Sequence, residues 1–215
     1  MSIELMDEHE RGERVRRWLH DNGSALLGGV GIGLLAFFGW QWHQGGQLQA
    51  KHDAAMQYEA VRKAVESDQT ETVAEIAKGL NDKFPGSPYV ALAQLQMAQL
   101  KSDAGDFDAA LAALEAARAA TDEVLLKDLT ALRMARIKHA QGALDEALAL
   151  LSGLDKSYSG LAGELRGDIL RAQGKPIEAV EAYQDALTHL QEGLPARGLV
   201  ELKLADLGAS APLES

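Results

Sequence analysis

Cysteine is absent from the 215 residues. This absence excludes disulfides, thiolate nucleophiles, iron–sulfur clusters and thiolate zinc sites, but it does not indicate a redox compartment. Basic residues are also scarce: 21 Lys and Arg stand against 32 Asp and Glu, and the formal net charge is −11. An acidic chain without a long basic run neutralises few phosphates, so nucleic acid is not an expected partner.

Signatures of catalytic and cofactor sites are also missing. The sequence has no G-x-S-x-G elbow and no Walker loop, and its six histidines are scattered without an H-x-x-x-H pair. Its acidic residues are typical of solvated helix faces rather than of paired carboxylates for acid–base chemistry. We therefore expect no enzyme activity, no catalytic residues, no cofactor and no metal site.

Aromatic residues make up only 5% of the chain, and all three tryptophans lie in the first 42 residues. They flank a charge-free run of twenty residues from Gly23 to Trp42, which as a helix would span about 30 Å, the thickness of a bilayer core. Trp18 precedes the run, and Trp40 and Trp42 end it, where indole rings favour the headgroup regions. We predict a single transmembrane helix over residues 23–42.

The residues before this run favour a retained anchor over a cleaved signal peptide. A signal peptide has a short basic start, an apolar core of about 7–15 residues and a small-residue cleavage site, and none of these fits. Four arginines precede the run, whereas Lys51 and Arg62 are the only cations in the twenty residues after it. The positive-inside rule predicts cytoplasmic residues 1–22, with the rest of the chain in the periplasm of a Gram-negative cell, anchored in the inner membrane.

Glycines inside the predicted anchor have three interpretations. Gly31-x-Gly33-x-x-Ala36 formally matches a dinucleotide fingerprint, but that motif needs a preceding strand and a soluble helix, so we set it aside. Ala25, Gly29 and Gly33 recur every four residues, a small-residue stripe that lets a second transmembrane helix approach closely. Glycine is also common in membrane helices in general. Both of these last interpretations stay open.

Beyond Gly45-Gly46 the composition predicts an all-α domain, rich in Ala, Leu, Glu, Lys and Gln, without sustained alternation of β-branched residues. One phrase recurs three times, beginning at Gly105, Gly142 and Gly174. The spacings of 37 and 32 residues are close to the period of about 34 in tetratricopeptide repeats, which are stacked helix pairs.

Small residues at fixed positions set the register of these repeats. The second helix carries a small residue and, four residues later, a larger apolar one, as in the tetratricopeptide A-x-x-x-F pair. The first helix carries a small residue seven positions before the glycine. These positions are Ala110/Leu114, Ala147/Leu151 and Ala179/Tyr183, and Ala98, Ala135 and Gly167. We therefore expect close crossing of the paired helices.

An earlier unit, 37 residues before Gly105, is less regular. Helices are expected near residues 47–66 and 71–84, but Val73 and Ala77 fit the pattern poorly. Whether this unit is a true repeat is left open.

The C-terminal end of the array predicts a closing element. Residues 194–207 form an amphipathic pattern suited to a helix that caps the last repeat. The predicted repeat domain therefore spans residues 43–207, and residues 208–215 form a flexible tail.

Repeat solenoids usually bind partners on the concave surface formed by the first helix of each pair. Arg133, Arg136 and His139 recur every three residues there and are suited to hold carboxylates of a protein partner. Pairing with an acid of the neighbouring repeat, such as Asp168, is the alternative. The Lys and Asn array by which some tetratricopeptide proteins clamp a peptide C-terminus is absent. The predicted protein-binding residues are Leu95, Gln99, Arg133, Arg136, His139 and Arg171.

Four segments in this order resemble the YfgM-type tetratricopeptide proteins: Trp18-Leu-His-Asp-Asn-Gly23, Gly39-Trp-Gln-Trp42, Arg166-Gly-Asp-Ile-Leu170 and Leu202-Lys-Leu-Ala-Asp-Leu207. The resemblance covers nearly the whole chain. It implies an inner-membrane protein with a periplasmic repeat domain, an ancillary subunit of the SecYEG translocon that associates with the membrane-anchored isomerase PpiD and periplasmic chaperones. The family has no catalytic residues to carry over.

Two non-enzymatic functions follow. The resemblance implies a scaffold at the SecYEG translocon that binds proteins through its repeats and links secretion to periplasmic chaperones. The alternative is an envelope-assembly or stress-regulation adaptor with no direct translocon role. Factors of that second class commonly have cleaved leaders or a trimeric coiled coil, and the sequence predicts neither.

Overall fold

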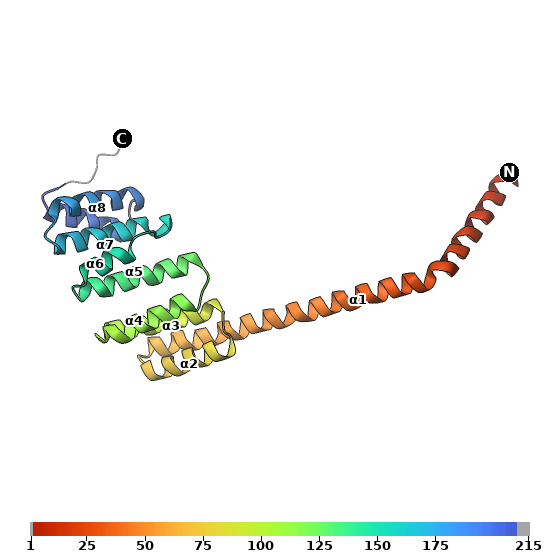
Figure 1. Cartoon of the computed structure of the whole chain (residues 1–215), viewed down its shortest axis with the longest axis horizontal. Coiled ribbons are helices and arrows are strands. Elements are labelled where there is room, and N and C mark those ends of the chain that lie inside the picture. Colours follow the sequence, from red (N-terminus) through yellow and green to blue (C-terminus); the bar gives the residue numbers. More distant parts are fainter. Residues whose placement is uncertain (1, 210–215) are drawn as a thin grey trace. The chain divides into compact units, whose positions relative to one another are not determined.

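The computed structural model describes the backbone of residues 2–209 and the side chains of residues 13, 16–41 and 48–209. All regular elements in this part of the chain are helical, as predicted (Figure 1). They are α1 (Ser2–Glu66), α2 (Thr70–Lys83), α3 (Pro88–Asp103), α4 (Phe107–Ala119), α5 (Val124–Ala140), α6 (Leu144–Leu150), the short 3-10 helix η1 (Lys156–Tyr158), α7 (Ser159–Ala172), α8 (Pro176–His189) and α9 (Pro195–Asp206). Contacts divide the chain into two units, between His52 and Asp53.

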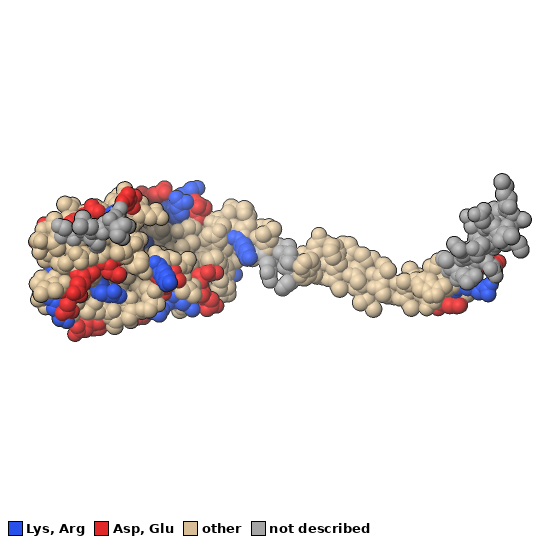
Figure 2. All heavy atoms as spheres, turned by 90° about the horizontal axis from the view of Figure 1, so that it is seen from above, with Lys and Arg blue, Asp and Glu red and all other residues tan. Residues whose placement is uncertain are grey.

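The first unit contains a helical segment, Arg16–Gln41, that is long and apolar enough to cross a membrane. Beyond Asp21 this segment carries no charged residue, and Figure 2 shows the corresponding uncharged surface. A continuous apolar surface of this kind is normally covered by lipid or protein. Its large side chains are 41% to 77% exposed: Leu26, Leu27, Val30, Ile32, Leu34, Leu35, Phe37 and Phe38.

Helix α1 does not break at Gly45-Gly46, where the composition changes. A glycine in a helix interior costs only about 1 kcal/mol relative to alanine, and helix-forming residues continue on the C-terminal side. The helix expected near residues 47–66 is therefore the last part of α1 rather than a separate element. Trp18 and Trp40 are exposed, and the Trp42 side chain lies outside the described residues.

The second unit is a stack of helix pairs, in which α3 packs on α4, α5 on α6 and α7 on α8, and α9 closes the stack against α8 (Figure 1). Three cores follow one another along it. The first core joins the end of α1 with α2, α3 and α4 and includes Ile137 of α5. The second core joins α5, α6 and α7, and the third core joins α7, α8 and α9. The predicted solenoid and its closing helix are thereby confirmed.

Gly105, Gly142 and Gly174 form the turn inside each helix pair, with φ of 75°, 77° and 74°. Each glycine N–H donates to the carbonyl three residues earlier, and the following N–H donates to the carbonyl five residues before it. This is the Schellman arrangement that ends a helix, and glycine adopts its left-handed conformation without strain. The glycine spacing in the sequence therefore predicts the turns, because the left-handed backbone of each turn favours glycine.

The irregular segment before α3 has the same turn. Asp68 lies 37 residues before Gly105 and has a φ of 53°. Its N–H donates to Val65 at 3.0 Å, and the next N–H donates to Ala64 at 2.9 Å. Val73 and Ala77 are buried in the first core. The end of α1 and α2 therefore form a first repeat, in which valine replaces the expected small residue.

The array ends on one more turn of this kind. Gly208 has a φ of 72°, and the Ala209 N–H donates to the Leu204 carbonyl at 3.0 Å. Ala209 packs against the third core. The remaining residues of the predicted tail, 210–215, lie outside the described residues.

Candidate protein-binding surface

The first helices of successive repeats bring polar side chains together on one face of the solenoid. Gln96 of α3 and Arg133 of α5 are related by the repeat spacing of 37 residues. The Gln96 side chain donates to the Tyr58 hydroxyl at 3.4 Å, and Nη1 of Arg133 donates to the Leu95 carbonyl at 3.2 Å. Tyr58, Gln96, Arg133 and Tyr158 are here called the inner-face cluster.

A cleft of about 270 Å³ opens between α3 and α5. Both Arg133 and Arg136 line it, and their guanidinium groups are the only charged groups among its lining residues. The other lining residues are Ala98, Gln99, Ser102, Leu114 and Ile137. Gln99 donates to Asp103 of its own helix at 2.9 Å, and Asp103 does not line the cleft.

The guanidinium of Arg133 lies in an unfavourable electrostatic environment. Burial lowers the pKa of Arg133, and the positive charge of Arg136 lowers it further, while Tyr158 and Tyr58 act in the opposite direction. Among the described residues, no carboxylate forms an ion pair with Arg133 or Arg136. Two like charges therefore share a cleft without a counter-charge from any described residue.

Tyr158 is held in place at the edge of this environment. Its hydroxyl donates to the Leu125 carbonyl at 3.0 Å. Burial raises the pKa of Tyr158, and the negative charge of Asp128 raises it further. Tyr158 therefore stays neutral at physiological pH and offers a hydroxyl beside the arginine.

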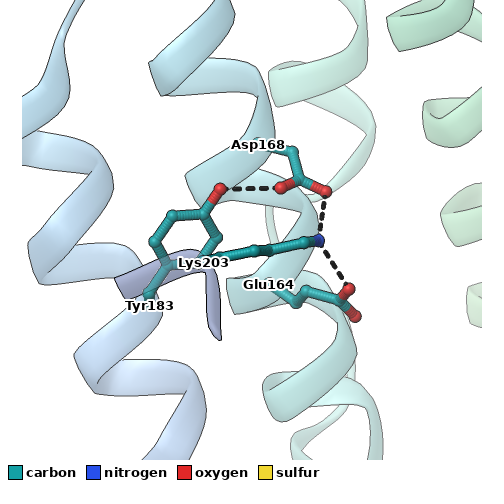
Figure 3. A network of polar contacts seen from close by, with 4 residues as sticks. All are labelled: Glu164, Asp168, Tyr183 and Lys203. Carbon is teal, nitrogen blue, oxygen red and sulfur yellow. Dashed lines mark hydrogen bonds and ion pairs between the residues drawn. The ribbon is translucent and has the colours of Figure 1, made fainter. Parts of the chain in front are cut away.

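Asp168 is not the internal partner of these arginines. It accepts hydrogen bonds from the Tyr183 hydroxyl and from Lys203 Nζ, both at 2.7 Å (Figure 3). The alternative in which Asp168 neutralises Arg133 or Arg136 is therefore wrong, since its carboxylate is already engaged by α8 and α9.

The network around Asp168 ties the closing helix to the repeat below it. Lys203 of α9 also donates to Glu164 of α7 at 2.8 Å, and its Nζ lies 5.9 Å from the centroid of the Tyr183 ring (Figure 3). The Lys203 and Glu164 side chains are only 18% and 11% exposed. Burial raises the pKa of Tyr183, and its hydrogen bond to Asp168 raises it further. Because one ammonium group engages both carboxylates and the tyrosine hydroxyl bonds to one of them, this network stabilises the fold rather than offering a binding site.

The remaining predicted surface residues have different outcomes. Leu95 is 4% exposed and packs in the first core, so the prediction that its side chain lines a binding surface is wrong. Gln99 lines the cleft, whereas His139 and Arg171 do not. His139 is half-buried on α5, and Arg171 is exposed on α7.

Sequence reasoning missed Tyr58, Gln96 and Tyr158. The 37-residue spacing contained a signal for Gln96, because it places Gln96 and Arg133 at the same position of successive repeats. The same spacing pairs Leu95 with the buried Leu132. No local pattern pointed to the two tyrosines, which approach Arg133 only through the stacking of repeats.

The small-residue stripe of the apolar segment contacts no other side chain among the described residues. Ala25, Gly29 and Gly33 are all exposed, and a Cβ at either glycine would meet no atom within 4 Å. Elsewhere in the described residues, no group of three His, Cys, Asp or Glu side chains could hold a metal ion.

Comparison with known families decides the classification of this fold. The model of the tetratricopeptide repeat-like domain family matches residues 16–209, which include both the apolar segment and the whole solenoid. The chain belongs to this family.

Family relatives resemble the chain over most of its length. A protein of Aggregatibacter actinomycetemcomitans named ancillary SecYEG translocon subunit is 28% identical, over 94% of this chain and 98% of the relative. Proteins with the same name from Haemophilus influenzae and Escherichia coli are 27% and 28% identical, over 84% and 83% of this chain and 89% and 86% of the relatives. The resemblance to ancillary translocon subunits inferred from sequence segments is confirmed.

Solved structures confirm the fold alone. Nearly identical TPR-like repeats from a Podosopora anserina protein assigned to the kinesin light chains superpose with a TM-score of 0.53 at 20% identity. The match covers 73% of this chain and 86% of that one.

Proposed function

We propose that the protein is a non-enzymatic scaffold of the bacterial inner membrane that associates with the SecYEG translocon and binds proteins through its repeats. The observation that carries this proposal is the extent of the similarity to ancillary translocon subunits, which includes the apolar segment together with the repeat domain. The resemblance to the YfgM-type proteins also implies a PpiD-like isomerase and periplasmic chaperones as partners.

The proposed topology places residues 1–22 in the cytoplasm, 23–42 in the membrane and the repeat domain, residues 43–207, in the periplasm, followed by the tail 208–215. Its support is the excess of arginine before Gly23 and the exposed apolar surface of α1. Protease added to spheroplasts should digest the repeat domain. Protection until the inner membrane is opened, or a soluble mature form beginning near Lys51, would contradict it.

Translocon association is tested by co-purification of the full chain in mild detergent. SecYEG and a PpiD-like isomerase should be recovered with it. Recovery of envelope-assembly factors without SecYEG would instead support the adaptor alternative.

The stripe of Ala25, Gly29 and Gly33 is proposed as the contact with a partner helix in the membrane, because close approach in lipid favours missing side chains. Gly29→Leu combined with Gly33→Leu should preserve insertion and weaken co-purification. Gly28→Leu combined with Gly39→Leu is the matched control, because 100° per residue puts these two glycines on another face of the helix. Equal co-purification of both double variants would show that the stripe is incidental.

A further inference from the structure

We propose that the cleft between α3 and α5 binds a carboxylate of an acidic peptide segment, held between Arg133 and Arg136. The proposal rests on the proposed function only in that the repeat domain binds proteins. It names the chemistry of the bound segment and the residues that select it.

Charge is the first reason. The guanidinium of Arg133 is half-buried, donates to a backbone carbonyl rather than to a carboxylate, and shares the cleft with Arg136. Among the described residues neither arginine has a counter-ion, although acidic residues outnumber basic ones in the chain. A bound carboxylate offsets both the desolvation of Arg133 and its repulsion by Arg136, and guanidinium groups match carboxylate geometry.

Shape is the second reason. The cleft is lined by the apolar residues Ala98, Leu114 and Ile137 as well as by its two arginines and two other polar residues. Its volume of about 270 Å³ suits one side chain with its methylene groups and excludes a folded domain. The group that enters the cleft is therefore a single side chain or a chain end.

The surroundings of the cleft suit a peptide backbone. Tyr58 and Gln96 precede Arg133 on the inner face, and Tyr158 follows it. The Gln96 amide can donate to and accept from peptide groups, and the Tyr158 oxygen, whose proton goes to Leu125, can accept. Tyr and Arg are also enriched in protein interfaces. These residues extend the site beyond the carboxylate and favour a peptide over a free small anion.

The test measures peptide binding to the full chain in detergent micelles by fluorescence anisotropy. Four labelled eight-residue peptide probes are compared. Two alternate Leu and Glu, and two alternate Leu and Gln. Each sequence is made once with a free C-terminus and once with an amidated C-terminus. The Glu probes test side-chain carboxylates, and the Gln probe with a free C-terminus tests the chain end. At least one carboxylate probe should bind about tenfold or more tightly than the amidated Gln probe, and higher salt should reduce the difference.

Arg136→Gln should remove this preference because it removes one of the two cations that line the cleft. Arg136 is exposed, so its loss leaves the core intact. Arg118→Gln is the matched control, since Arg118 lies exposed on α4 and does not line the cleft, and it should leave the preference unchanged. Equal binding of all four probes, no binding of any probe, or equal effects of the two variants would overturn the proposal. Co-purification with SecYEG is measured separately, so a failure of translocon association is distinguished from a failure of the carboxylate site.

Discussion

Gly167 of α7 faces the buried ring of Tyr183 on α8 so closely that a Cβ at Gly167 would lie 2.3 Å from Cε1 of that ring. The tyrosine cannot easily withdraw, because it is fully buried and its hydroxyl is bonded to Asp168. The small position seven residues before the repeat glycine is therefore a direct steric requirement in this repeat.

Gly167→Ala should accordingly lower the free energy of unfolding by about 1–3 kcal/mol, the usual cost of overpacking. Urea unfolding of the full chain in detergent, followed by circular dichroism, measures it. Gly198→Ala in α9 is the control, since a Cβ there meets nothing within 4 Å. It should stabilise by up to about 1 kcal/mol through helix propensity. Equal effects of the two changes would contradict close crossing of α7 and α8.

Replacing Asp68 by glycine and Gly105 by aspartate should change the free energy of unfolding in opposite directions. Asp68→Gly removes the backbone strain of a left-handed aspartate but raises the conformational entropy of the unfolded chain. A net gain of about 0.5–1 kcal/mol in the free energy of unfolding is expected. Gly105→Asp introduces the same strain and should cost about 1–2 kcal/mol. The same urea experiment decides, and a loss of stability in Asp68→Gly would show that its side chain contributes something else.

Lys203→Met should destabilise the repeat domain by about 2–4 kcal/mol, because it leaves the buried Glu164 carboxylate and Asp168 without their cation. Lys127→Met removes an exposed bridge to Asp122 and should change stability by no more than about 0.5 kcal/mol. Comparison of their thermal unfolding tests the expectation. Similar melting of both variants would show that the network contributes little.

Stability should depend on Tyr183 in alkaline solution. The pKa of Tyr183 is raised in the folded chain above its ordinary value of 10.0. Its contribution is therefore complete below pH 10 and is lost as the pH rises above 10, because the unfolded tyrosine ionises first. The stability difference between the wild type and Tyr183→Phe should shrink between about pH 9 and pH 11. A constant difference over that range would contradict the raised pKa.

Local backbone requirements explain which parts of the fold the sequence could predict. The turn itself needs Gly105, Gly142 and Gly174, so their spacing predicts the repeats without any information on how the helices pack. Val73 looked unsuitable because its fit depends on the helices around it, and those place it in the first core. The continuity of α1 through Gly45-Gly46 was missed because the change in composition suggested a boundary.

The candidate site was predictable only in part for a related reason. Arg133 and Arg136 stand out as cations on one stripe, but Tyr58 and Tyr158 lie in other repeats and influence the pKa of Arg133 only through the stacking of those repeats. The choice of Lys203 rather than an arginine as the partner of Asp168 likewise depends on where the packing of α9 against α8 places the Lys203 side chain. Contacts between repeats carry no local sequence signature.

The three cores are joined in series through single helices. Helix α5 gives Ile137 to the first core and Leu132 to the second, and α7 gives Ile169 to the second and Leu170 to the third. Unfolding of α8 and α9 therefore disrupts the third core and leaves the first core and the inner-face cluster on folded helices. Amide hydrogen exchange should then be graded along the array rather than uniform, so that loss of order at the C-terminal end need not abolish binding near the N-terminal repeats.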